Sequence, residues 1–129
     1  MVVDSSAFLA ILLGEPEALA FRTALGGDAT RLTSSASLLE TTMVMLTRFG
    51  EPGAAELQAL LRVADVQSAP FGPEHLGIAI DAFRRFGKGR HPAALNFGDC
   101  FSYALAKATG EPLLFKGDDF SRTDIKGVL

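Results

Sequence analysis

The sequence predicts a single α/β domain over residues 1–129, in which a short parallel sheet is sandwiched between helices (α/β/α). Two observations lead to this prediction. Short apolar runs alternate with longer segments that carry helix start and stop signals, and this alternation is typical of a parallel sheet covered on both faces. The chain is also 48% hydrophobic, which is enough to form a core and excludes a disordered protein.

The predicted strands are short and apolar, and each precedes a turn or a helix start. They cover residues 1–4, 30–33, 66–69 and 113–115. The predicted helices begin at a capping serine or a proline, and most of them end at a glycine. They cover residues 5–13, 16–26, 35–49, 52–63, 73–86 and 97–109.

Composition excludes several classes of protein. The one cysteine, Cys100, excludes a disulfide framework and a cysteine-based zinc site. No apolar run reaches the roughly 18 residues of a membrane span. Residues 1–13 do not resemble a signal peptide, since Asp4 interrupts them and no basic segment precedes them, so we expect a cytoplasmic protein. The net charge of −3 argues against a generally basic nucleic-acid binder, but an acidic centre that recruits divalent cations remains compatible with RNA as a substrate.

Three carboxylates stand alone in apolar sequence. Asp4 is the first charged residue, Glu40 is the only one between Arg31 and Arg48, and Asp99 follows Arg90 without another charge between them. An unpaired buried carboxylate costs several kcal/mol or changes its pKa, so these acids require partners. We therefore expect all three to be buried and to share a common ligand.

Topology predicts that these acids meet. Asp4 ends the first strand, Glu40 and Asp99 lie near helix starts, and Asp118 and Asp119 follow the last strand. These positions share the carboxyl edge of a parallel sheet, where open α/β folds bind ligands. Clustered carboxylates without cations favour Mg²⁺, or Mn²⁺ in its place. The alternative is that each acid is a helix cap, which fits Asp99 best and Glu40 least.

The remaining polar features are less specific. Four cations precede Asp99, and they form either a solvated helix end or a phosphate-binding loop with mobile glycines: Arg84, Arg85, Lys88 and Arg90. His75, His91 and Cys100 belong to no catalytic motif, and the ten phenylalanines are interpreted as core residues, not as base-stacking platforms.

Four segments carry a resemblance to a known family. They are VDSSA at 3–7, SASLLE at 35–40, LNFGDCFSYA at 95–104 and LLFKGDDF at 113–120. Together they resemble the PIN-domain ribonucleases, and most closely the VapC toxins of bacterial toxin–antitoxin pairs. This resemblance runs along the whole chain in the family's order.

The resemblance implies a Mg²⁺-dependent endoribonuclease. Asp4, Glu40 and Asp99 match the family's metal-binding acids, Asp119 (or else Asp118) matches the fourth, and Ser6 matches a small hydroxyl residue near the metal. A carboxylate-held ion activates water and neutralises phosphate charge. We expect Arg85, Lys88 and Arg90 to hold the RNA.

The resemblance also implies partners, namely a second copy of the chain in a homodimer and a VapB-type antitoxin. The sequence places the apolar docking face on the N-terminal helices, and the antitoxin would send a basic side chain into the acidic pocket. The residues expected on this face are Phe8, Leu12, Leu13, Leu19 and Phe21.

Three other function classes share features with this sequence. A haloacid-dehalogenase-like phosphatase requires a second aspartate at position 6, where this chain has Ser6. A receiver domain requires its paired acids near the N-terminus, but Asp118 and Asp119 lie near the other end. A catalytically silent PIN-fold binding module remains the main alternative, and metal-dependent RNase activity would separate it from the nuclease.

Overall fold

The computed structural model describes residues 1–129. The four strands are β1 (Val2–Val3), β2 (Leu32–Ser34), β3 (Gln67–Ala69) and β4 (Leu113–Leu114). The helices are α1 (Ser5–Leu12), α2 (Ala18–Gly27), α3 (Ser35–Phe49), α4 (Glu51–Val63), α5 (Pro73–Phe86) and α6 (Phe97–Thr109), with a 3₁₀ turn at Phe120–Arg122.

The sheet is parallel throughout, with strand order β3-β2-β1-β4. From β1 the chain crosses to β2 on one side, whereas β4 lies on the other side of β1. The strand order therefore reverses between β1 and β4, and the crevice at their carboxyl ends is the usual ligand position in such sheets. This arrangement confirms the predicted fold class.

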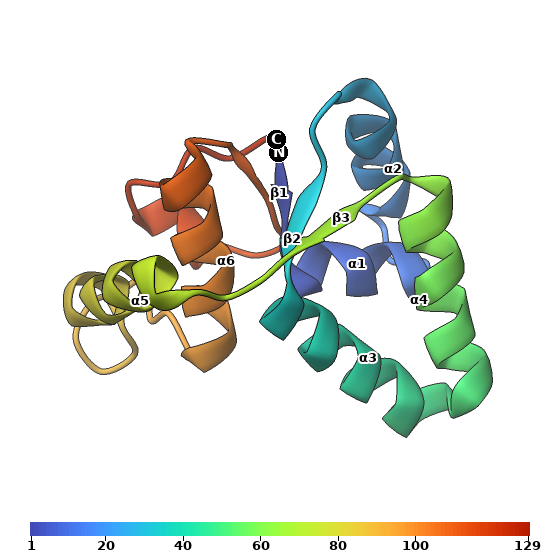
Figure 1. Cartoon of the computed structure of the whole chain (residues 1–129), viewed down its shortest axis with the longest axis horizontal. Helices are drawn as coiled ribbons and strands as arrows, with labels where there is room; N and C mark the ends of the chain where they lie inside the picture. Colours follow the sequence, from blue (N-terminus) through green and yellow to red (C-terminus); the bar gives the residue numbers. More distant parts are fainter.

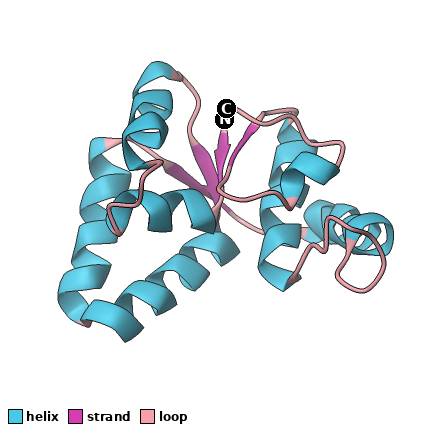
Figure 2. Cartoon of the chain, turned by 180° about the vertical axis from the view of Figure 1, so that it is seen from behind, coloured by secondary structure: helices cyan, strands magenta, loops and turns pink.

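Helices cover both faces of the sheet. Successive residues of a strand point to opposite faces, so each strand contributes side chains to both cores. Val3 and Leu114 pack with α1, α2 and α4 in one core, and Val2 and Leu113 pack with α5 and α6 in another. Figures 1 and 2 show the strands between these two helical groups.

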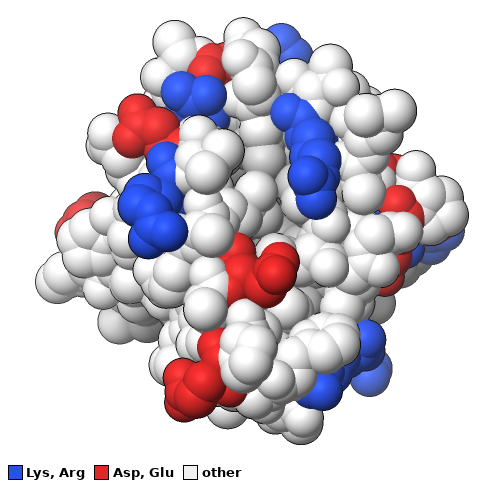
Figure 3. Space-filling view, turned by 90° about the vertical axis from the view of Figure 1, so that its right-hand side faces the viewer, with Lys and Arg blue, Asp and Glu red and all other residues white.

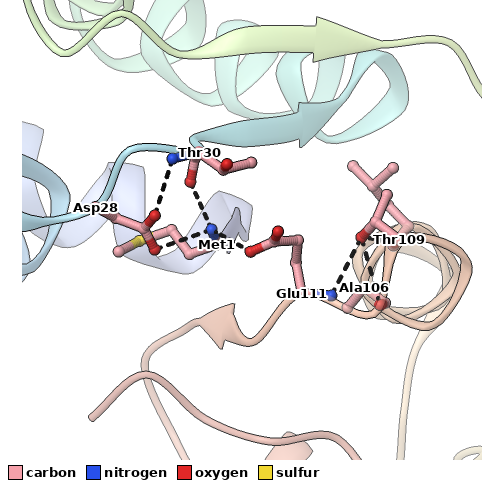
Figure 4. Close-up of polar contacts among 7 residues, drawn as sticks. Met1, Asp28, Thr30, Ala106, Thr109 and Glu111 are labelled. Carbon is pink, nitrogen blue, oxygen red and sulfur yellow. Dashed lines mark hydrogen bonds and ion pairs between the residues drawn. The ribbon is translucent and has the colours of Figure 1, made fainter.

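The amino edge of the sheet is held by the first residue. The ammonium group of Met1 donates to Asp28 Oδ2 at 3.0 Å, to Glu111 Oε2 at 2.7 Å and to the Thr30 carbonyl (Figure 4). These contacts join β1 to the segments that lead into β2 and β4. The opposite, carboxyl edge of the sheet, where Asp4 lies, takes no part in these contacts.

Several boundaries differ from the sequence prediction. Helix α2 begins at Ala18, because Pro16 lies in a turn after Gly14, whose φ is +65°. Strand β2 ends at Ser34, whose hydroxyl then caps α3 by accepting from the Ala36 amide at 3.3 Å. The 3₁₀ turn and the pairing of Gly127 with Leu113 were not predicted.

The predicted apolar docking face on the N-terminal helices is wrong. Phe8 and Phe21 are buried in the core, Leu12 and Leu13 are half-buried, and of the five residues Leu19 alone is exposed. The side formed by α2 and α4 shows acidic and basic side chains interspersed among uncharged ones (Figure 3). The large exposed apolar side chains lie mainly on α3, α5 and α6. No helix has both the length and the apolar character that crossing a membrane would require.

Candidate active site

Asp4 follows β1 and is the N-cap of α1. Its Oδ2 accepts from the Ser6 amide at 3.0 Å and from the Ser6 hydroxyl at 2.6 Å, and its Oδ1 accepts from the Ser102 hydroxyl at 2.5 Å. Asp4 is buried, as expected, with 4% of its surface exposed. Neutral hydroxyls hold this carboxylate in place and leave its negative charge uncompensated.

Glu40 lies on α3, and the expectation that it is buried is wrong. Helix α3 buries the stripe that carries Ser37, Thr41 and Met45, so Glu40 faces solvent. Its Oε2 accepts from the Ser5 hydroxyl at 2.8 Å. This contact ties the carboxylate to the start of α1, directly after Asp4.

Gly98 brings Glu40 against α6. A Cβ atom at Gly98 would lie 2.7 Å from both carboxylate oxygens of Glu40, which is closer than such atoms approach. The glycine before Asp99 therefore gives the Glu40 carboxylate the room to lie beside the start of α6.

Asp99 was expected to be buried but is half-buried, because it lies in the first turn of α6, where it combines a cap with a site position. Its Oδ2 accepts from the Asn96 amide at 2.9 Å while Asn96 Oδ1 accepts from the Asp99 amide, so the two residues form a capping box. Burial, together with the charges of Asp4, Asp119 and Glu40, raises the pKa of Asp99 to about 7, against the opposing effect of the Asn96 hydrogen bond. The cap and site interpretations are therefore compatible.

The pKa of Asp99 also distinguishes the two acids that follow β4, Asp118 and Asp119. Asp119 contributes to the raised pKa of Asp99, whereas Asp118 is not among the groups that do so. Both residues are exposed, and the Asp118 carbonyl accepts from the Ser121 hydroxyl at 2.6 Å. This arrangement favours Asp119 as the fourth acid.

Contacts with Ser5, Ser102 and Gly98 thus place Asp4, Glu40 and Asp99 around the starts of α1 and α6. Asp119 acts on the pKa of Asp99, and none of the four acids forms an ion pair. The donor set consists of oxygen ligands, which suits Mg²⁺ or Mn²⁺. As the side chains stand, no three of them are close enough to hold a metal ion. Their serine contacts would have to be exchanged in part when an ion binds.

The serine network was missed by the sequence interpretation, apart from Ser6. Ser6 also accepts from the Lys116 amide at 3.0 Å, which joins α1 to the segment after β4. Ser37 and Ser102 lie 3.2 Å apart between α3 and α6. Their spacing was a usable signal, since Ser37 precedes Glu40 by three residues and Ser102 follows Asp99 by three, which places each serine about one helical turn from an acid.

The basic cluster is divided by the structure. Arg85 pairs with Asp81 at 3.6 Å and with Asp124 at 3.3 Å, so it is engaged away from the acids. Arg84, Lys88 and Arg90 are exposed and form no ion pair. The Arg90 guanidinium lies 5.5 Å from the centre of the Phe83 ring. These three cations remain available to anions.

Comparisons with known proteins agree with this architecture. The PIN domain model matches residues 1–126. The chain is 52% identical to the VapC ribonuclease Mb0640 of Mycobacterium bovis over 128 residues, covering 99% of this chain and 98% of that protein. It is 51% identical to a Ribonuclease VapC of Mycolicibacterium smegmatis, covering 99% of each.

A solved structure shows the same fold. The crystal structure of Mycobacterium tuberculosis VapC20, described as a sarcin–ricin loop cleaving toxin, has a TM-score of 0.77 and covers 96% of this chain and 95% of its own. The sequence identity is 20%, so this likeness concerns the fold. A phosphatase or receiver fold is inconsistent with these matches. The chain belongs to the PIN-domain family and, within it, to the VapC proteins.

Proposed function

We propose that the protein is a metal-dependent endoribonuclease that acts as the toxin of a VapBC-type pair in the cytoplasm. One observation supports this proposal, namely that the half-buried Asp99 has the acids Asp4, Asp119 and Glu40 as its charged neighbours, and none of these four carboxylates is paired with a cation. The mycobacterial relatives named as VapC ribonucleases support RNA as the substrate.

Asp4 and Asp99 would be the primary ligands of Mg²⁺, or of Mn²⁺ in its place, and Glu40 and Asp119 would complete the coordination. When bound, the ion would supply positive charge for a phosphate oxygen and acidify a water molecule. Three hydrogen bonds from Ser6 and Ser102 hold the buried Asp4 carboxylate in one orientation.

Glu40 and Asp99 would have different roles, one toward the attacking water and the other toward a proton. Glu40 is exposed and keeps one oxygen on the Ser5 hydroxyl, so it would orient the attacking water. The raised pKa of Asp99, about 7, allows this carboxyl group to hold a proton near neutral pH until a cation displaces it. Lys88 and Arg90 would bind the RNA phosphates, whereas Arg85 is already paired.

The decisive experiment is cleavage of bacterial total RNA with and without EDTA. Wild-type protein with Mg²⁺ should cut, and Asp4→Asn and Asp99→Asn should not. Asp118→Asn is the matched control, because it removes a neighbouring carboxylate outside the cluster. Equal cleavage by wild type and Asp99→Asn would contradict the site, and a folded wild type that never cuts would favour the silent binding module.

We also infer a VapB-type antitoxin that blocks the acidic site with a cationic side chain, because the carboxylates lack ion pairs of their own. Co-purification with the product of the neighbouring reading frame should abolish RNA cleavage. An antitoxin that binds without inhibiting would show that it does not occupy the site. We infer a homodimer as the working form of the enzyme.

A further inference from the structure

Two buried hydroxyl groups lie behind Asp4. Ser37, on α3, and Ser102, on α6, are both fully buried, and their hydroxyl oxygens are 3.2 Å apart. The Ser102 hydroxyl also lies 2.5 Å from Asp4 Oδ1. Neither serine hydroxyl is left without a hydrogen-bond partner. Ser37 and Ser102, the hydroxyl pair, therefore form a short chain of hydrogen bonds that ends at the Asp4 carboxylate.

The direction of this chain follows from the number of protons. A carboxylate must be ionised to bind a metal ion, and an ionised carboxylate only accepts hydrogen bonds. Each serine hydroxyl has a single proton to donate. Ser102 therefore donates to Asp4 Oδ1, and Ser37 donates to Ser102. Because hydrogen bonds in a chain polarise one another, Ser37 strengthens the bond that Ser102 makes to Asp4.

The two carboxylate oxygens of Asp4 are not equivalent. A carboxylate oxygen has about two acceptor positions. Oδ2 uses both of them, for the Ser6 amide at 3.0 Å and the Ser6 hydroxyl at 2.6 Å, whereas Oδ1 uses one, for the Ser102 hydroxyl. Oδ1 is therefore the oxygen that keeps a free position for a cation, and Ser102 is the group that orients it.

The hydroxyl pair also joins the three elements that carry three of the acids. Ser37 lies about one turn before Glu40 on α3, and Ser102 lies about one turn after Asp99 on α6. The contact between the two serines joins these helices, and the bond to Asp4 joins both of them to the end of β1. Mg²⁺ requires near-ideal octahedral geometry, whereas Ca²⁺ accepts a more flexible set of ligands. Fixing these elements relative to one another therefore favours Mg²⁺.

We propose that Ser102 is a positioning residue of the metal site. With Ser37 behind it, Ser102 holds Asp4 so that Oδ1 is presented to Mg²⁺, and the hydroxyl pair makes the site prefer Mg²⁺ to Ca²⁺. This inference rests on the proposed ribonuclease function and adds to it two residues that act only through a metal ligand. Hydrogen-bond partners of ligating groups change metal affinity by about 10–100-fold, so the effect is large enough to measure.

The first experiment is a calorimetric titration of Mg²⁺ into the folded variants. Ser102→Ala should raise the Kd for Mg²⁺ by about 10–100-fold, and Ser37→Ala should raise it less, because Ser37 acts through Ser102. Thr41→Val is the matched control: Thr41 is equally buried on α3, but its hydroxyl donates to the Ser37 carbonyl and to no acid, so the Kd should stay unchanged. An unchanged Kd in folded Ser102→Ala would overturn the proposal.

A double variant and a second ion separate positioning from a general loss of packing. Ser37→Ala/Ser102→Ala should bind Mg²⁺ as Ser102→Ala does, because Ser37 has no route to Asp4 once Ser102 is gone. In Ser102→Ala the Kd for Mg²⁺ should rise more than the Kd for Ca²⁺. Effects of the two serines that simply multiply, or an equal rise for both ions, would contradict the proposal.

The titrations need no RNA, so the two proposals can fail separately. A wild type that binds Mg²⁺ with these serine effects and never cleaves RNA would reject the ribonuclease function and support the inference. RNA cleavage by wild type, together with normal Mg²⁺ binding by Ser102→Ala, would reject the inference alone. A wild type that binds no Mg²⁺ would overturn both.

Discussion

Asp99 lies in the first turn of α6 and Asp124 is hydrogen-bonded to later turns of the same helix, yet the environments of the two carboxylates are opposite. Asp124 is exposed, and although some desolvation acts to raise its pKa, the Tyr103 hydroxyl at 2.7 Å, Lys107 at 3.0 Å and the charge of Arg85 lower that pKa to about 2. Burial raises the pKa of Asp99 to about 7, and its charged neighbours are all acids. One carboxylate is satisfied by the fold, and the other is left for a ligand.

The comparison separates a structural acid from a functional one by the charge that surrounds it. Asp124 fastens the segment after the 3₁₀ turn to α5 and α6, whereas Asp99 and its neighbours cost folding free energy by their mutual repulsion. Such a cost is typical of sites that are stabilised when their ligand binds. Exchanging or titrating the two aspartates tests this distinction.

The largest expected effect concerns activity. Asp99→Asn should lower RNA cleavage by about a hundredfold or more, because it removes a proposed metal ligand. Asp124→Asn should leave the cleavage rate within about twofold once the protein is folded, since Asp124 contacts no acid of the site. Initial rates on a fluorescent RNA would measure both. Comparable losses in the two variants would remove the distinction.

Stability should respond in the reverse order. Asp124→Asn should lower the free energy of unfolding by about 1–2 kcal/mol, since it weakens the hydrogen bond to the almost fully buried Tyr103 and two partly exposed ion pairs. Asp99→Asn should change stability little or raise it, because repulsion among the acids is relieved. Urea denaturation followed by circular dichroism gives both values, with Asp118→Asn as the surface control.

Metal should stabilise the protein through one of these two acids. At ten times its dissociation constant, Mg²⁺ should add about 1.4 kcal/mol to the free energy of unfolding of wild type. The same increment is expected for Asp124→Asn and none for Asp99→Asn, which a thermal melt in Mg²⁺ against EDTA would show. A Mg²⁺ response that survives in Asp99→Asn would place the ion elsewhere.

The smallest effect is a dependence of stability on pH without metal. Asp99 has a folded-state pKa of about 7, above the ordinary aspartate value of 3.8, so the folded chain binds more protons than the unfolded chain between these pH values. Stability should therefore fall as pH rises toward 7, by less than about 1.4 kcal/mol per unit because solvent screens the site. The stabilisation by Asp124 is present above its unfolded pKa and is lost as pH falls toward 2. Melts of wild type and Asp99→Asn at pH 5, 6 and 7 should converge at low pH, and parallel curves would contradict this assignment.

The sequence was sufficient for features encoded locally. Gly and Pro signals together with short apolar runs predicted the α/β alternation. Strand ends predicted that the residues after β1 and β4 would lie side by side, as the hydrogen bond from the Lys116 amide to the Ser6 hydroxyl shows. Where a side chain's surroundings depend on distant residues, the sequence failed. Glu40 was expected in the core because its neighbours are apolar, but the apolar stripe of α3 faces outward.

Long-range pairing explains the other failures. Arg85 looked like a free cation because its partner Asp124 lies 39 residues later, and nothing local reveals that contact. Phe8 and Phe21 looked like an apolar surface, but they fill the core between the sheet and α2. The phenylalanines interpreted as core residues include Phe97, which is mostly exposed. Periodicity shows that a helix has an apolar face and does not show which element covers it.

Gly98 offers a way to silence the protein without removing any of its acids. A methyl group there would meet the carboxylate of Glu40, which is the far end of a flexible side chain and can swing away at little cost to folding. Gly98→Ala should therefore give a chain with normal melting behaviour and a displaced Glu40. When it is expressed without the antitoxin, this variant should not stop the growth of host cells. It should still bind the antitoxin and sequester it. Growth arrest at the wild-type level would show that Glu40 tolerates the displacement.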